Sequence, residues 1–161
     1  MEIRLDGEVA LVTGASRGIG QAIALALGQA GATVIGTATS ENGAQAIGGY
    51  LAAANVQGRG MKLDVTDAVE VDAVIAAIEK DFGGIGILVN NAGITRDNLL
   101  MRMKDEEWDA ILATNLTSVF RLSRAVLRAM MKARQGRIIS IASVVGAMGN
   151  AGQTNYSAAK A

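Results

Sequence analysis

A short apolar run that ends in a glycine-bearing turn is the feature that most constrains the fold of this chain. Residues 9–12 (VALV) are all apolar, and the turn that follows has glycines at positions 14, 18 and 20. A continuous apolar run of this length is typical of a parallel strand buried on both faces. Glycine lets the backbone turn tightly and approach a bound phosphate, and the amino end of the next helix attracts an anion. The pattern predicts a dinucleotide-binding loop. The alternative is that the glycines serve only the turn and close helix packing.

Apolar runs and amphipathic stretches alternate along the rest of the chain. Further strands are predicted at residues 33–35, 61–63, 87–89 and 138–142. Helices are predicted from residue 19 to a stop at Gly31, and over residues 42–54, 71–78 and, in two segments, 105–133. In the last of these, five side chains are expected to face inward: Leu112, Leu116, Val119, Val126 and Met130. Because right-handed crossovers place helices on both faces of a parallel sheet, we expect one α/β domain over residues 1–161, doubly wound.

Composition excludes several classes of function. Lys and Arg total 15, as do Asp and Glu, so the net charge is zero and a nucleic-acid partner is not expected. The chain has no Cys and no His, which removes disulfides, a Ser-His-Asp triad and the commonest metal ligands, so no metal site is expected. Acid–base chemistry must therefore use Tyr, Lys, Asp, Glu or water. The first residues lack the pattern of a signal peptide, and no apolar run approaches the ~18 residues of a membrane span. A cytoplasmic protein without a membrane segment is expected.

The charge pattern after the second strand favours one dinucleotide over the other. An NAD site has an acidic residue at this point to bind the ribose 2′-hydroxyl. Residues 36–40 (GTATS) contain no carboxylate that would repel a 2′-phosphate, and Thr37, Thr39 and Ser40 can donate hydrogen bonds to one. Arg17 in the glycine loop is a candidate to pair with that phosphate, unless it is only a solvated surface charge. NADP is therefore favoured over NAD.

Tyr156 and Lys160 form the candidate catalytic pair. They are four residues apart, which places them on one face of a helix. A free tyrosine has a pKa near 10, and a neighbouring ammonium favours the phenolate and so brings the hydroxyl closer to general acid–base use. Ser143, after the fifth strand, supplies a hydroxyl for a carbonyl oxygen on which negative charge develops. On spacing alone, the tyrosine and lysine could equally be an ordinary surface pair.

Taken together, these segments resemble the short-chain dehydrogenase/reductase superfamily along the whole chain. The matching segments are TGASRGIG at 13–20, LDV at 63–65, NNAG at 90–93, Asn115, Ser143 and the Tyr156-x-x-x-Lys160 motif. Residues 36–47, 93–108 and 144–155 are similar to the bacterial 3-oxoacyl-[acyl-carrier-protein] reductases. The resemblance implies a Rossmann-like sheet of about five strands in the order 3-2-1-4-5. It also implies a truncated fold, since family members continue well beyond the lysine.

The resemblance also implies roles for individual residues. Tyr156 would donate a proton to the substrate carbonyl while NADPH supplies the hydride, and Lys160 would lower the tyrosine pKa and bind the nicotinamide ribose. Ser143 would orient the substrate carbonyl. Asn115 would hold a water in a proton relay that reaches Lys160, or alternatively is a satisfied polar residue at a helix kink. The implied cofactor-binding residues are Gly14, Ala15, Ser16, Arg17, Ile19, Thr39, Asp64, Val65, Asn91, Ala92, Gly93, Tyr156 and Lys160.

The implied substrate is a 3-oxoacyl thioester carried by an acyl carrier protein, reduced in fatty acid biosynthesis by a homotetramer. Six cations lie close together in the sequence: Arg121, Arg124, Arg128, Lys132, Arg134 and Arg137. Part of this basic stretch is a candidate surface for the acidic carrier protein, and the alternative is a solvated helix face. Two other functions remain open. One is a non-catalytic fragment that only binds the cofactor; the other is a reductase of acetoacetyl-CoA or another small ketone.

Overall fold

A five-stranded parallel sheet forms the centre of the protein. The computed structural model describes residues 3–161. The strands run in the spatial order β3-β2-β1-β4-β5, which is the predicted order. Their bounds are β1 (Val9–Val12), β2 (Thr33–Ala38), β3 (Gly58–Lys62), β4 (Ile87–Asn90) and β5 (Arg137–Ser140). All four pairings are parallel. The predicted α/β architecture, wound on both sides of the central strand β1, is confirmed.

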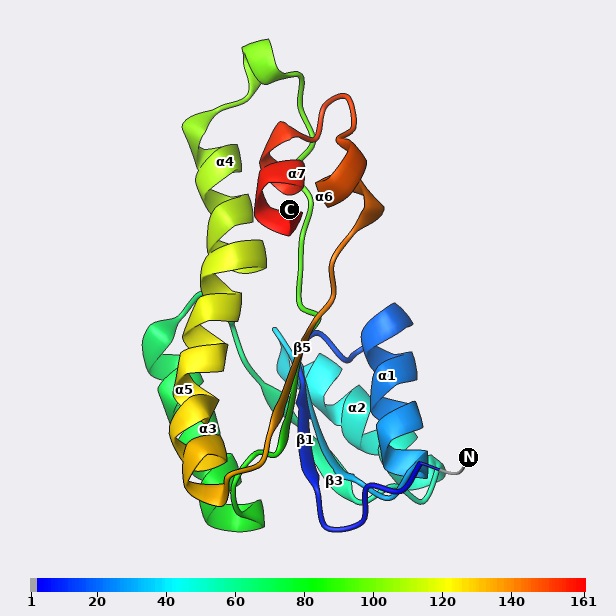
Figure 1. Cartoon of the computed structure of the whole chain (residues 1–161). Helices are drawn as coiled ribbons and strands as arrows, with labels where there is room; N and C mark the ends of the chain where they lie inside the picture. The colour runs from blue at the N-terminus through cyan, green and yellow to red at the C-terminus, as the bar shows by residue number, and fades with distance from the viewer. Residues whose placement is uncertain (1–2) are drawn as a thin grey trace.

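Two helical layers cover the sheet (Figure 1), and alternate residues of β1 pack into opposite cores. Helices α1 (Gly18–Gln29) and α2 (Glu41–Ala53) lie on one face, and α3 (Ala68–Phe82) and α5 (Ser118–Ala133) on the other. On β1, Ala10 and Val12 pack in the first core, whereas Leu11 packs in the second. A strand buried on both faces needs an apolar residue at every position, which is why residues 9–12 show no polar alternation.

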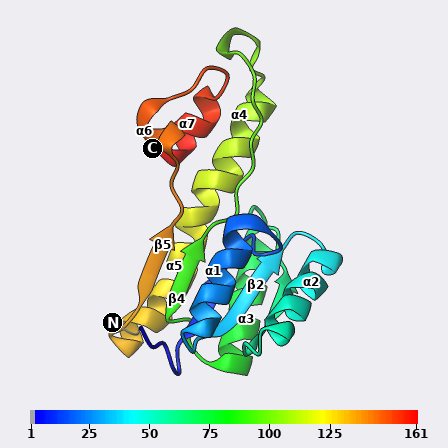
Figure 2. The same ribbon diagram turned by 90° about the vertical axis from the view of Figure 1, so that its right-hand side faces the viewer.

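A group of short elements rises beyond the carboxyl ends of the strands (Figures 1 and 2). It contains η1 (Leu100–Arg102), α4 (Asp105–Leu112), the π-helical turn η2 (Ala113–Thr117), α6 (Val144–Met148) and α7 (Thr154–Lys160). Helix α7 packs against α4, η2 and α6. The chain leaves β5 and climbs into this group, so the last residues lie above the sheet edge rather than within a layer.

The long predicted helix differs in detail from the expectation. It does form two segments, but Leu116 is 48% exposed and does not face inward. The π turn inserts a residue into the helical repeat and rotates the following face. Asn115 takes the inward position instead and is 2% exposed, whereas Val126 and Met130 are buried as predicted.

Four of the five predicted strands have different ends, and the differences are informative for β3 and β5. β3 begins at Gly58 rather than at residue 61. Helix α2 lies close over the start of this strand and requires glycine there; a Cβ on Gly60 would come within 1.8 Å of the Ala44 carbonyl oxygen. A strand with glycine at such a contact lacks the apolar run that marks β1. β5 ends at Ser140, although the Ile141 N–H still donates to the Asn90 carbonyl at 3.0 Å. Within residues 3–161, no helix combines the length and hydropathy needed to cross a bilayer.

Candidate cofactor and catalytic site

A cavity of about 480 Å³ opens at the carboxyl end of the sheet, between the glycine loop and the loops that follow β2, β3 and β4. Ten of the predicted cofactor residues line it: Gly14, Ser16, Arg17, Ile19, Thr39, Asp64, Val65, Asn91, Ala92 and Gly93. Ala15 does not line it, because its side chain is fully buried beneath the loop. Tyr156 and Lys160 lie outside its lining, on α7 above the sheet. The cavity therefore joins loops from four strands, as expected at the edge where parallel strands end.

Glycine is required where the loops approach one another. Gly14 has a φ of +63°, and a Cβ there would lie 2.9 Å from the Ala92 Cα. A Cβ on Gly20 would lie 2.1 Å from the Gly14 carbonyl oxygen. Among the described residues, no side chain caps the amino end of α1. Free N–H groups at a helix start, beside a loop without side-chain bulk, provide a site that fits the phosphates of a dinucleotide.

Thr13 and Asn91 fasten the glycine loop to the loop after β4. The Thr13 hydroxyl oxygen accepts hydrogen bonds from the N–H groups of Asn91 (3.1 Å) and Ala92 (3.0 Å). The Asn91 amide donates to the carbonyl oxygens of Thr13 and Gly14, both at 3.0 Å. Asn91 thus supports the glycine loop from below. Thr13 was not singled out from the sequence as a site residue, because a threonine at the start of a turn carries no pattern of its own.

Two charged side chains, Arg17 and Asp64, line the cavity. Arg17 and Thr39 are exposed at its rim. Ser40 caps α2 by accepting from the Gly43 N–H at 3.1 Å, which leaves its hydroxyl hydrogen free to donate. Among the described lining residues, Asp64 is the one acidic side chain. The Thr66 hydroxyl and N–H both donate to its carboxylate, and they lower its pKa. Residues 3–161 contain no cluster of three acidic, His or Cys side chains that could hold a metal ion.

Lys160 is anchored beside the Tyr156 ring. Its ammonium nitrogen donates to the Ile141 carbonyl oxygen at 2.8 Å and lies 6.0 Å from the centroid of the Tyr156 ring. Burial lowers the pKa of the Lys160 ammonium below its ordinary value. Tyr156 is half-buried. The two side chains thus share a face of α7, as their spacing predicts.

Ser143 and Asn115 lie on the segments that surround α7. Ser143 precedes α6 and caps it by accepting from the Val145 N–H at 3.2 Å. Close packing of α6 on α7 depends on Gly146, where a Cβ would come within 2.4 Å of the Lys160 carbonyl oxygen. Asn115, in the π turn, accepts from the Ile94 N–H (3.0 Å) and donates to the Ile94 carbonyl (2.9 Å). Both ends of its side-chain amide are therefore engaged with the loop after β4.

Comparison with known proteins agrees with this geometry. The family model described as short chain dehydrogenase matches residues 8–161. The chain belongs to the short-chain dehydrogenase family. It is 68% identical over 159 residues to the 3-oxoacyl-[acyl-carrier-protein] reductase FabG of Vibrio cholerae, and 66% identical over 159 residues to that of Escherichia coli. The FabG protein of Pseudomonas aeruginosa is 65% identical over 157 residues. These alignments cover 98–99% of this chain but only 64% of each relative's length.

Two polar side chains of this short-chain dehydrogenase, buried Asn155 and half-buried Tyr50, were not anticipated from the sequence. Asn155 is fully buried and binds three segments: its amide donates to the carbonyls of Arg96 (2.9 Å) and Glu107 (3.3 Å) and accepts from the Tyr156 N–H (2.8 Å). Tyr50 of α2 donates to the Ala15 carbonyl at 2.7 Å. Apart from the Tyr156 N–H, their partners are distant in the chain, so no local pattern could have indicated these contacts.

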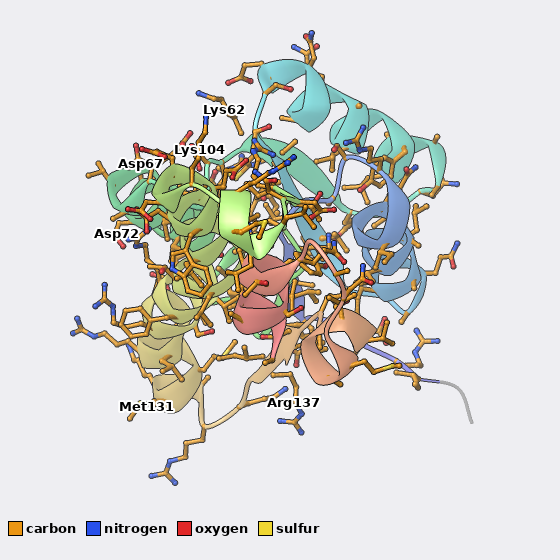
Figure 3. All side chains as sticks on the ribbon, turned by 90° about the horizontal axis from the view of Figure 1, so that it is seen from above. Lys62, Asp67, Asp72, Lys104, Met131 and Arg137 are labelled. Atoms are coloured by element: carbon orange, nitrogen blue, oxygen red, sulfur yellow. The ribbon has the colours of Figure 1, made fainter. Side chains whose placement is uncertain are left out.

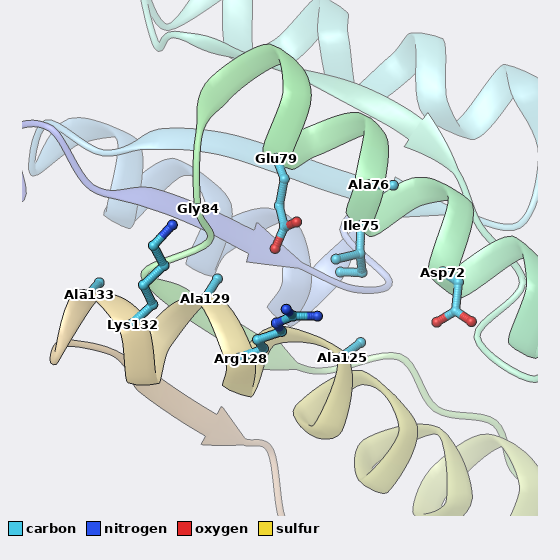
Figure 4. Close-up of a pocket in the computed structure, with 10 residues that line it drawn as sticks. All are labelled: Asp72, Ile75, Ala76, Glu79, Gly84, Ala125, Arg128, Ala129, Lys132 and Ala133. Atoms are coloured by element: carbon cyan, nitrogen blue, oxygen red, sulfur yellow. The ribbon is translucent and has the colours of Figure 1, made fainter.

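A larger cavity of about 700 Å³ lies between α3 and α5, away from the glycine loop (Figure 4). Its uncharged lining is Ile75 with alanines and Gly84, and Asp72 and Glu79 on α3 lie opposite Arg128 and Lys132 on α5. None of the residues predicted to bind the cofactor or to act in catalysis lines it. Size alone therefore does not identify the site, and the glycine-loop cavity is the candidate.

Proposed function

We propose that this chain carries the cofactor-binding and catalytic residues of an NADPH-dependent reductase of 3-oxoacyl thioesters. The distance of 6.0 Å between the Lys160 ammonium and the Tyr156 ring centroid is the observation that carries the proposal. It gives a cation beside a phenol, at the same edge of the sheet as a glycine-lined cavity. In a chain without histidine, this pair is the most suitable acid–base group.

The proposed reaction reduces a ketone by adding one hydride and one proton, which together are two electrons and two protons. Bound NADPH would supply a hydride for the carbonyl carbon. Tyr156 would give its hydroxyl proton to the carbonyl oxygen, which becomes the 3-hydroxyl group. Lys160 would stabilise the phenolate that remains until solvent returns a proton. Ser143 would hold the carbonyl oxygen through its hydroxyl hydrogen, since its oxygen already accepts from Val145.

The role proposed for Asn115 is to position a loop and not to take part in the reaction directly. Both polar atoms of its side chain bind the Ile94 backbone, and a Cβ on Gly93 would come within 2.6 Å of its Oδ1. We propose that it holds the loop after β4 against the π turn, beside the nicotinamide end of the cavity. A water relay that reaches Lys160 would then use backbone groups of this turn rather than the Asn115 amide.

The cofactor proposed is NADPH rather than NADH. The cavity rim has Arg17, and the described residues at the end of β2 include no carboxylate that would oppose a 2′-phosphate. The glycine loop fits the phosphate groups because it has no side-chain bulk. A Cβ at Gly14 or Gly20 would collide with the neighbouring backbone. Binding of NADPH and NADH to the same preparation compares the two cofactors directly.

An acyl carrier protein is the proposed bearer of the substrate, because the relatives carry that substrate in their names. The last four cations of the basic stretch separate into two pairs. Arg128 and Lys132 face the acidic rim of α3, whereas Arg134 and Arg137 border a shallow hollow beside Met131. Met131 and Arg137 lie at the same side of the molecule in Figure 3. Arg134 and Arg137 form the proposed docking surface for the carrier protein. The enzyme is proposed to be a homotetramer in the cytoplasm.

The proposal is tested by NADPH oxidation in the presence of an acetoacetyl thioester of acyl carrier protein, with acetoacetyl-CoA as the comparison substrate. Steady oxidation that Tyr156→Phe abolishes is the expected result. A higher kcat/KM with acetoacetyl-CoA would favour a reductase of small thioesters instead. NADPH binding without any turnover would favour a module that binds the cofactor but does not catalyse.

A further inference from the structure

We propose that Tyr50 is a positioning residue for the cofactor: its hydroxyl sets the orientation of the peptide group that presents the Ser16 N–H to a dinucleotide phosphate. The inference rests on the proposed NADPH site and extends it to a residue of α2, outside the glycine loop. Tyr50 does not line the cavity. It acts through the backbone of Ala15.

The contact itself is short and partly shielded from solvent. The Tyr50 hydroxyl donates to the Ala15 carbonyl oxygen at 2.7 Å, across 35 residues of sequence. Burial raises the pKa of Tyr50 to about 12, so the hydroxyl keeps its hydrogen and remains a donor throughout the neutral range. A second tyrosine, Tyr156, is the only other phenol in the chain.

The Ala15 backbone is held from two sides. Its N–H donates to the Thr37 carbonyl of β2 at 2.8 Å, and its carbonyl accepts from Tyr50. The carbonyl of Ala15 and the N–H of Ser16 belong to one peptide group, and peptide bonds among the described residues are trans. In a trans peptide these two groups point in opposite directions. A carbonyl directed to Tyr50 therefore directs the Ser16 N–H away from α2, and Ser16 lines the cavity.

Glycines allow α2 to lie close enough for this contact. A Cβ on Gly36 of β2 would lie 2.7 Å from the Ile47 Cγ2 and 3.0 Å from the Ala15 Cβ. A Cβ on Gly60 of β3 would meet the Ala44 carbonyl oxygen. Side chains at these positions would push α2 outward and remove Tyr50 from Ala15. The packing of α2 on the sheet is thus coupled to the geometry of the glycine loop through the Tyr50 hydroxyl.

The test measures NADPH affinity of the 161-residue chain with Tyr50→Phe, which keeps the ring and removes only the hydroxyl. The dissociation constant is expected to rise between about twofold and tenfold, the affinity equivalent of one hydrogen bond. The control is Ile78→Val, which shortens a fully buried side chain of α3 and lowers stability without contact to the site. Ile78→Val is expected to bind NADPH as the wild type does. Circular dichroism checks that both variants are folded at the temperature used.

A second readout separates positioning from a general loss of structure. Adenosine carries no phosphate, so its affinity is expected to be equal in wild type and Tyr50→Phe. In wild type, the Ser16 amide is expected among the nuclear magnetic resonance signals that NADPH shifts most. Unchanged NADPH affinity in Tyr50→Phe, an equal loss in Ile78→Val, or an unshifted Ser16 amide would each overturn the inference while the wild type still binds NADPH. A wild type that binds no NADPH would overturn the proposed function together with it.

Discussion

The Lys160 ammonium nitrogen donates to the Ile141 carbonyl oxygen at 2.8 Å, which attaches the end of α7 to the residue that follows β5. Ile141 is itself held by the sheet, since its N–H donates to the Asn90 carbonyl of β4 at 3.0 Å. The position of the lysine beside Tyr156 therefore depends on the pairing of β4 with β5, and not only on the seven residues of α7. A helix this short would not hold a side chain in place by itself.

Replacement of Lys160 by Met tests the part played by its charge. Met has nearly the same length but cannot donate to Ile141 or stabilise a phenolate. NADPH oxidation is expected to fall by about 10²- to 10⁴-fold, the range for loss of acid–base assistance. NADPH oxidation at saturating substrate measures this loss. A Lys160→Met variant with wild-type kcat would contradict the proposed role of the ammonium.

A variant without Tyr156 allows Tyr50 to be titrated alone. In Tyr156→Phe, the phenolate absorbance reports Tyr50 alone and is expected to appear with a midpoint near pH 12 instead of the ordinary 10.0. A raised pKa in the folded state means that the folded chain binds the proton more tightly than the unfolded chain. The stability that Tyr50 contributes is thus complete below pH 10 and is lost as the pH rises from 10 to about 12.

Denaturation by urea, compared between wild type and Tyr50→Phe, measures that loss. The difference in free energy of unfolding is expected to shrink across the same pH range. A constant difference would indicate that the hydroxyl makes no contribution that depends on its proton.

The sheet could be predicted from the sequence because buried parallel strands leave apolar runs. Residues 9–12 and 87–89 are such runs, and β1 and β4 form there. The carboxyl edge of a parallel sheet collects the loops that follow its strands, so the glycine loop and Asn91 could be expected to lie together. β3 carries Gly58 and Gly60 where α2 approaches, so its start left no apolar signal.

The polar contacts that hold the site together could not be predicted from the sequence. Leu116 was expected to face inward because helical spacing assumes an uninterrupted repeat, and the π turn breaks that repeat at Asn115. Asn155 binds backbone groups 59 and 48 residues away. A buried amide has no periodicity, and its partners follow only from how the loops pack. The same holds for Tyr50 and Ala15.

Asn155 is expected to be the residue whose loss most disturbs Tyr156 without touching the cofactor cavity. Asn155→Ala removes the side-chain amide that donates to the carbonyls of Arg96 and Glu107. The free energy of unfolding is expected to fall by about 1–3 kcal/mol, since two partly buried hydrogen bonds are lost. kcat is expected to fall while the dissociation constant of NADPH stays unchanged.

Asn155→Asp provides the matched comparison. It keeps an acceptor for the Tyr156 N–H but brings a carboxylate against two carbonyl oxygens. Its stability is expected to recover as the pH falls, because a protonated carboxyl can donate one hydrogen bond. Thermal melting at several pH values measures the recovery. Equal stability of Asp and Ala variants at every pH would contradict the hydrogen-bonding account.

Gly20 and Gly49 provide a matched pair for the glycine loop. A Cβ on Gly20 would lie 2.1 Å from the Gly14 carbonyl oxygen and 2.6 Å from the Asn91 amide nitrogen, so Gly20→Ala must displace one of these loops. NADPH binding is expected to be lost. Gly49, within α2, has no atom within 4 Å of an added Cβ. Gly49→Ala is expected to raise stability by about 0.5–1 kcal/mol through helix propensity and to leave NADPH affinity unchanged. Isothermal calorimetry and thermal melting of both variants check the pair.

Arg134 and Arg137 are expected to affect the carrier protein and not the chemistry. Both side chains are exposed and border the hollow that Met131 and Ile138 also line. In the double variant Arg134→Gln and Arg137→Gln, KM for a thioester on acyl carrier protein is expected to rise several-fold, because long-range attraction to an acidic partner is reduced. KM for the corresponding thioester of coenzyme A is expected to stay the same.

The dependence on salt separates this attraction from a local structural effect. In the wild type, KM for the carrier-protein substrate is expected to rise with ionic strength, and in the double variant this slope is expected to be smaller. Lys80→Gln, which removes a cation from the last turn of α3, is the control and is expected to keep the wild-type slope. If the double variant changes KM for both substrates alike, the two arginines support the fold of this edge, and the docking surface must lie elsewhere.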